Sequence, residues 1–162
     1  MAESILINKR LSLEGQYKLF IKQIKSLLNK NDNYLSNLSN LTAAFKQSFD
    51  KISWVGFYIF DGKKLYLGPF QGKAACTEID IGKGACGTAA QKRETVIVPN
   101  VNEFPDHISC DADSRSEIVI PLIKNKEPFG VLDIDSTFYS SFNEIDKFYL
   151  EEIANFLMQE IL

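Results

Sequence analysis

The chain has 162 residues, of which 45% are hydrophobic and 24% are charged, and its formal net charge is -3. These values are typical of one compact globular domain and give no electrostatic reason to expect a nucleic-acid partner. No uncharged apolar run approaches the ~20 residues that a membrane span requires, so we expect a soluble, cytoplasmic protein without a membrane partner.

The cysteines of the chain are Cys76, Cys86 and Cys110. An odd number of cysteines without an export signal argues against the disulfide framework of a small secreted protein. Reactive thiols and buried, inert thiols are the two remaining interpretations.

The first fifty residues are predicted to be helical. Apolar residues recur at spacings of three and four over 11–28, and the same period continues over 35–49. The polar segment 29–33 between them contains turn and capping residues.

The rest of the chain is predicted to form strands and one short helix before a final helix. Strands are expected at 52–60, 65–70, 76–81 and 95–99, and the glycine-rich segment 82–94 is expected to enter a short helix. A long irregular loop follows over 99–116, and loops of this length inside a compact domain are usually either functional or disordered.

A second hairpin is predicted from strands 116–124 and 128–136, joined by the polar turn NKE. The chain then closes with an amphipathic helix whose candidate N-cap is Asn143. This order of elements predicts an α+β domain, with an antiparallel sheet and helices packed mainly on one of its faces.

Three acidic residues are predicted to lie on the second hairpin. In GVLDIDS, Asp133 and Asp135 share one strand face, and Glu117 begins the partner strand. Carboxyl groups this close do not all ionise readily, so at least one is expected to keep its proton near neutral pH. The alternative is that all three are solvated charges at strand ends.

Two aromatic residues are predicted to share a face of the first strand. Trp54 and Tyr58 are four residues apart, and Gly56 between them is expected to leave open space. They either wall a pocket suited to a methyl-sulfur group or pack in the core.

The single histidine, His107, precedes Cys110 by three residues. A Cys–His pair can activate a thiolate, but a loop histidine that bonds the backbone is the commoner outcome. A zinc site from the cysteines and His107 is not favoured because the chain lacks a C-x-x-C pair, and we expect no metal. GKGACGT also lacks the residue order of a phosphate-binding loop.

Several segments together resemble one known family. WVGFYIF, GPFQGKAACTEIDIGKGACGTAAQKRETVIVPNV, HISCDADSRSEIVIPL and GVLDIDS are similar to the GAF-domain free methionine-R-sulfoxide reductases. The most specific part is the context of the cysteines, ACT, GxCG and IxCDxxS. The resemblance implies a single GAF domain over 1–162, with a helical segment over 1–50 and the sheet, active-site loops and C-terminal helix over 51–162.

The resemblance also implies a mechanism. Cys110 is the nucleophile that becomes a sulfenic acid, Cys76 is the resolving thiol, and Cys86 is either an alternative resolving thiol or an auxiliary one. Thioredoxin or a similar dithiol reduces the resulting disulfide, so no bound cofactor is expected. The residues implied to bind and activate free methionine sulfoxide are Glu117, Asp133, Asp135, Trp54 and Tyr58.

Some features of the site stay open between alternatives. The substrate carboxylate is held either by backbone N–H groups of CDADS or by Arg115, which alternatively pairs with Asp111 or Asp113. GAF domains often dimerise through terminal helices, and the amphipathic segment 11–28 is a candidate interface. The rival function is a non-catalytic GAF module that senses a small ligand or a redox signal.

Overall fold

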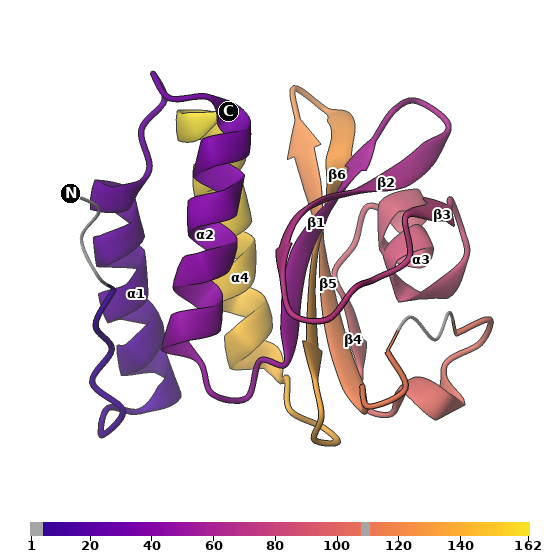
Figure 1. Cartoon of the computed structure of the whole chain (residues 1–162), viewed down its shortest axis with the longest axis horizontal. Coiled ribbons are helices and arrows are strands. Elements are labelled where there is room, and N and C mark those ends of the chain that lie inside the picture. Colours follow the sequence, from indigo (N-terminus) through magenta and orange to yellow (C-terminus); the bar gives the residue numbers. More distant parts are fainter. Residues whose placement is uncertain (1–4, 108–110) are drawn as a thin grey trace.

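The computed structural model describes residues 5–107 and 111–162, which form one antiparallel sheet with helices on both faces (Figure 1). The strand order is β3-β2-β1-β6-β5-β4. The strands are β1 (Trp54–Phe60), β2 (Lys64–Gln71), β3 (Glu78–Asp80), β4 (Val96–Val98), β5 (Ser116–Lys124) and β6 (Glu127–Ser136). The predicted α+β class and antiparallel sheet are confirmed.

Three of the helices pack on one side of the sheet, as predicted. Figure 1 shows α2 and α4 next to the sheet and α1 outside them, whereas α3 lies on the opposite face beside β3. The helices are α1 (Leu13–Leu27), α2 (Tyr34–Ser48), α3 (Gly84–Lys92) and α4 (Glu144–Phe156), and α4 continues into a π-helical turn, η2 (Leu157–Ile161).

Side-chain caps explain where the long helices begin. Ser12 accepts a hydrogen bond from the Gly15 N–H at the start of α1, and Asn33 caps α2 in the same way. Asn143 forms a capping box with Asp146 at the start of α4, which confirms the predicted N-cap.

The apolar face of α1 is buried within the chain. Tyr17, Phe20 and Ile24 of α1 belong to the core that α2, α4 and the sheet share. The helix face that the sequence offered as a dimer interface is therefore covered by the protein itself, and dimerisation stays a prediction. Among residues 5–107 and 111–162, no helix combines the length and apolar character needed to cross a membrane.

The two faces of the sheet support two separate cores. Leu132 and Ile134 of β6 point into the core under the helices α1, α2 and α4, while Val131 points to the core on the α3 side. This alternation follows from the two-residue period of a strand. It sends Asp133 and Asp135 to the α3 side, together with Val131.

A two-residue turn joins β5 to β6. Asn125 and Lys126 both have positive φ, 52° and 68°, which is the conformation of a type I′ hairpin turn. Glu127 pairs with Lys124 and belongs to β6, so the turn is one residue shorter than predicted. The pairing shifts by one residue between Leu122 and Ile123, and beyond this shift Glu117 lies directly opposite Asp135.

The connection predicted as an irregular loop over 99–116 contains a short 3-10 turn, η1 (Val101–Glu103). The Asn100 side chain caps this turn by accepting from the Asn102 N–H at 3.1 Å. The Val101 N–H donates to the Arg115 carbonyl at 2.9 Å, which holds the two ends of the connection together beside the sheet.

Candidate active site

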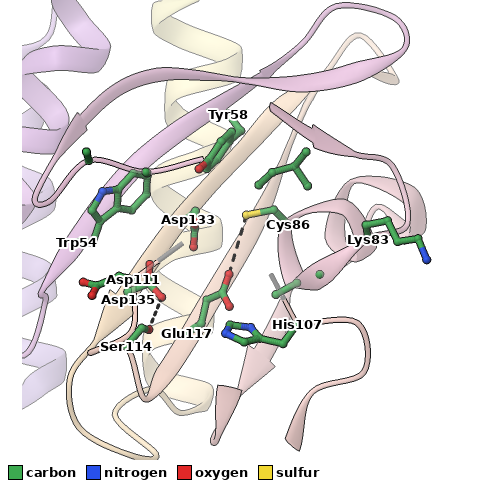
Figure 2. Close-up of a pocket in the computed structure, with 15 residues that line it drawn as sticks. Trp54, Tyr58, Lys83, Cys86, His107, Asp111, Ser114, Glu117, Asp133 and Asp135 are labelled. Carbon is green, nitrogen blue, oxygen red and sulfur yellow. Dashed lines mark hydrogen bonds between the residues drawn. The ribbon is translucent and has the colours of Figure 1, made fainter. Parts of the chain in front are cut away.

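A pocket lies on the α3 side of the sheet, and most of the predicted site residues line it (Figure 2). These are Trp54, Tyr58, Cys86, Glu117, Asp133 and Asp135. Cys76 lies in the connection between β2 and β3, where its carbonyl accepts a hydrogen bond from the Tyr58 hydroxyl at 3.0 Å. Cys110 lies outside the described residues.

The three acidic residues form a cluster on adjacent strands. Glu117 on β5 is opposite Asp135 on β6, and Asp133 lies two residues before Asp135 on the same face of β6. Glu117 and Asp133 are each 7% exposed, and Asp135 is half-buried. The predicted shared face of Asp133 and Asp135 is confirmed, and it is the floor of a pocket rather than a solvated strand end.

Burial and mutual repulsion favour the protonated forms of these acids. Burial raises the pKa of Glu117 well above its usual value, and the charges of Asp133 and Asp135 raise it further. Burial raises the pKa of Asp133 to about 6, although hydrogen bonds from its neighbours oppose this change. The pKa of Asp135 is also raised well above the ordinary value, chiefly by burial. The cluster therefore holds protons near neutral pH.

Deprotonation of this cluster is expected to lower the free energy of unfolding as the pH rises. The pKa of Asp133 is raised from its ordinary value in the unfolded chain to about 6 in the folded protein. Protonated Asp133 therefore stabilises the fold fully at a pH below the unfolded-chain pKa, and this stabilisation is lost as the pH rises through 6. Between about pH 5 and about pH 7.5, wild type should lose about 1 kcal/mol of unfolding free energy through this group. Asp133→Asn should show a smaller loss in urea unfolding, and an unchanged pH dependence would contradict the assignment.

Cys86 joins the acid cluster from α3. Its thiol is free, the residue is 3% exposed, and its Sγ donates to Glu117 Oε1 at 3.9 Å. Burial raises the pKa of Cys86 well above its usual value, and the charges of Asp133 and Glu117 act in the same direction. A thiol in this state is a hydrogen-bond donor rather than a reactive thiolate, which favours the auxiliary role.

Close packing of α3 brings Cys86 to this position. Gly87 follows Cys86, and a Cβ atom added to it would lie 2.3 Å from the Asp80 carbonyl oxygen. The Gly82 N–H donates to the Gly87 carbonyl at 2.8 Å, so the turn before α3 rests directly on the helix. Only a residue without a side chain fits here, which explains the glycine at position 87.

An aromatic wall closes one side of the pocket. The rings of Trp54 and Tyr58 are stacked, with centroids 6.1 Å apart, which confirms that they share a strand face. The prediction of open space at Gly56 was wrong. A Cβ atom at this position would lie 2.4 Å from the Trp54 indole and 2.6 Å from Phe70 Cβ. Gly56 instead allows the indole to lie against the strand. The Trp54 Nε1–H donates to the Lys73 carbonyl at 3.0 Å.

Ser114 is a site residue that the sequence interpretation missed. It is 5% exposed, lines the pocket, and its hydroxyl donates to Asp135 Oδ1 at 2.7 Å. This bond fixes the orientation of Asp135 and stabilises its ionised form. The sequence did contain a signal for this residue, because Ser114 is the final serine of IxCDxxS, the motif that surrounds Cys110.

The loop after Cys110 differs from expectation in its polar contacts. The N–H groups of Asp113 and Ser114 donate to Asp111 at 2.9 Å and 3.2 Å, so they are not free donors for a substrate carboxylate. Lys73, not Arg115, pairs with Asp111 and Asp113. The Arg115 guanidinium instead donates to the carbonyls of Ala112 and Ser114, because the turn folds back toward it.

His107 lines the pocket near Glu117 (Figure 2). Its backbone N–H donates to the Phe104 carbonyl at 3.2 Å, in agreement with the loop role that the sequence favoured. Partial burial lowers the pKa of His107 below its usual value, so its imidazole is neutral near pH 7. The neutral His107 imidazole therefore adds no positive charge to the acid cluster.

Comparisons with known proteins agree with this geometry. A GAF domain model matches residues 35–161. GAF domain-containing protein A of Dictyostelium discoideum is 49% identical over 97% of this chain and 99% of its own length. Free methionine-R-sulfoxide reductase of Saccharomyces cerevisiae is 40% identical over 96% of this chain and 91% of its own.

A solved structure extends the similarity to three dimensions. The free methionine-R-sulfoxide reductase of Neisseria meningitidis, in complex with its substrate, superimposes with a TM-score of 0.93 at 40% identity, covering 98% of this chain and 95% of that one. The chain belongs to the GAF-domain family of free methionine-R-sulfoxide reductases. Membership in this reductase family confirms the resemblance carried by the cysteine motifs.

Proposed function

We propose that this protein reduces free methionine-R-sulfoxide to methionine. The observation that carries the proposal is the buried acid cluster of Glu117, Asp133 and Asp135, which faces the aromatic wall of Trp54 and Tyr58 across one pocket. Such a pocket offers carboxylates for an ammonium group, a proton for a sulfoxide oxygen and aromatic surface for a methyl-sulfur group. The family relationship supplies the substrate class.

The first step is oxygen transfer to the enzyme. The Cys110 thiolate attacks the substrate sulfur and the sulfoxide oxygen takes up one proton. The oxygen is then transferred from the substrate to Cys110: the substrate S–O bond breaks, a Cys110 S–O bond forms to give the sulfenic acid, and methionine leaves. The proton comes from the acid cluster, with Glu117 as the donor because its buried carboxyl holds a proton near neutral pH. Support for Cys110 is its motif, since the residue lies outside the described part of the chain.

Asp133, whose pKa of about 6 leaves it ionised at neutral pH, binds the substrate ammonium. Asp133 Oδ1 is buried and lacks a hydrogen-bond partner among the described residues, so it is an acceptor available to a donor in the pocket. Asp135 lines the same pocket and is held by the Ser114 hydroxyl. A free amino acid presents this ammonium, whereas a methionine inside a peptide does not, and this difference supports a preference for the free substrate.

The second step regenerates the thiol. The Cys76 thiol attacks the sulfenic sulfur, water leaves, and a Cys76–Cys110 disulfide forms, which thioredoxin or a similar dithiol then reduces. This cycle requires no bound cofactor, because the electrons arrive from the dithiol. It operates only where such dithiols are kept reduced, so the proposal includes a cytoplasmic location.

A substrate panel tests the proposal. Free methionine-R-sulfoxide, free methionine-S-sulfoxide and a peptide containing the sulfoxide are each incubated with the protein, thioredoxin and its reducing system. Methionine, measured by amino-acid analysis, is expected from the free R form and not from the other two. Failure to form methionine from any of the three would favour the rival assignment, a GAF module that binds a ligand without turnover.

Cys76→Ala separates the resolving step from the chemistry. The variant is expected to form methionine normally in a single turnover but to turn over slowly with thioredoxin, because its sulfenic acid has no partner thiol. A small dithiol reacts directly with sulfenic acid and should restore much of the turnover. Equal activity of variant and wild type with thioredoxin would show that Cys76 does not resolve the intermediate.

A further inference from the structure

A thiol and two carboxyl groups converge in the pocket from three different elements (Figure 2). Cys86 on α3, Glu117 on β5 and Asp133 on β6 each offer one potential ligand atom, and these atoms lie within 4.8 Å of one another. All three residues are buried. Because regular elements carry them, their mutual arrangement is more precise than that of residues on loops.

The cluster also contains an acceptor that lacks a donor. Asp133 Oδ1 is buried without a hydrogen-bond partner within residues 5–107 and 111–162, and the Asp133 side chain lines the pocket. In the same part of the chain no ion pair includes Glu117 or Asp133, and Lys83 at the pocket pairs instead with Asp106. An unsatisfied buried carboxylate oxygen is costly, which indicates a place for a positively charged ligand.

The donor set matches a borderline-soft divalent ion. Zn²⁺ binds thiolate at about 2.3 Å and carboxylate at about 2.0 Å, which separates sulfur and oxygen by about 3.5 Å in a tetrahedral site. Cys86 Sγ and Glu117 Oε1 are 3.9 Å apart, so a small side-chain rotation suffices. Mg²⁺ and Ca²⁺ prefer six or more oxygen ligands and fit this set poorly.

We propose that Cys86, Glu117 and Asp133 bind a divalent transition-metal ion of the Zn²⁺ type, in competition with the sulfoxide substrate. Binding replaces the S–H bond of Cys86 by a sulfur–metal bond and releases the proton to solvent. The three protein ligands leave a fourth position toward the pocket for water. The metal site rests on the donor set and on the unsatisfied Asp133 oxygen, whereas the competition with the substrate rests on the proposed function.

The ion is an inhibitor in this proposal rather than a cofactor. It occupies the carboxyl groups to which the mechanism assigns the substrate ammonium and the catalytic proton. Zn²⁺ is therefore expected to raise KM for the free sulfoxide while kcat stays constant, and a chelator should reverse the effect. Saturating Zn²⁺ that leaves KM unchanged would overturn the competition.

Spectroscopy of Co²⁺ tests the site without reference to activity. In the full chain with Cys76→Ser and Cys110→Ser, Cys86 is the remaining thiol. Co²⁺ is expected to produce a thiolate-to-cobalt charge-transfer band that saturates at one ion per chain and that Zn²⁺, but not excess Mg²⁺, abolishes. Absence of this band in the folded protein would overturn the proposal.

Substitutions in this background identify the ligands. Asp133→Asn and Glu117→Gln are each expected to weaken Co²⁺ binding by roughly 100-fold, and Cys86→Ser should abolish the band. Glu127→Gln, which removes an exposed acid from the same hairpin, is the matched control and should bind as the background does. Should Cys86→Ser not fold, as judged by circular dichroism, Cys86→Ala replaces it.

The outcomes distinguish the two proposals. An unchanged Co²⁺ affinity in both carboxyl variants would show a different site and overturn the inference. A cobalt band with the expected ligand dependence, in a protein that forms no methionine from the free sulfoxide, would establish the metal site and refute the proposed function.

Discussion

Replacing Glu117 with glutamine is expected to lower kcat for free methionine-R-sulfoxide by roughly 100- to 10,000-fold, the usual range for loss of a general acid. Glutamine keeps the size of the side chain and can still accept from the Cys86 thiol, but it cannot transfer a proton to the departing oxygen. Methionine formation in a single turnover measures the chemical step directly, free of the thioredoxin-dependent step.

The control for this substitution is Glu127→Gln. Glu127 is exposed near the far end of the same hairpin, so its replacement makes the same chemical change without touching the pocket. Its single-turnover rate should match that of wild type. A Glu117→Gln variant that is folded and equally fast would remove Glu117 from the chemistry and leave Asp133 or Asp135 as the proton donor.

Cys110→Ser is expected to eliminate detectable turnover, because a serine hydroxyl at neutral pH is neither ionised nor able to accept oxygen from a sulfoxide. The variant should form no methionine even in a single turnover, and no sulfenic acid should be trapped by a dimedone-type reagent. Full activity of this variant would refute the assignment of the nucleophile.

Cys76→Ala provides the contrast for that experiment. It retains Cys110 and lacks the thiol that would consume the sulfenic acid, so trapping after one turnover should give more labelled protein than in wild type. The two cysteine variants thus have opposite expected results with the same reagent. Equal labelling in both would place the oxidised sulfur elsewhere in the chain.

The sequence predicted those features of the site that depend on local periodicity. Asp133 and Asp135 alternate with Leu132 and Ile134, so a strand of period two places the acids on one face and the apolar residues on the other. The capping role of Asn143 was equally local, since its donors lie within the next turn of α4. The spacing of residues along the chain decides such features.

Features that depend on contacts between distant segments were not predictable in the same way. The position of Cys86 beside Glu117 requires α3 to cross β5, and no spacing between the two residues indicates that contact. The pairing of Lys73 with Asp111 likewise brings together two connections that are distant in sequence. The Trp54 ring above Gly56 depends on a rotamer and on Phe70 of the neighbouring strand.

The turn of Asn125 and Lys126 affects the pairing of residues at the opposite end of the hairpin. Together with the one-residue shift in pairing between Leu122 and Ile123, it sets which residue of β5 faces which residue of β6 and keeps Glu117 opposite Asp135. A slip of β6 by one position against β5 would direct its acids into the helix-side core, with Leu132 and Ile134 turned into the pocket. A change in the length of this turn therefore preserves the acid cluster and the core only where the pairing shift in β6 compensates for it.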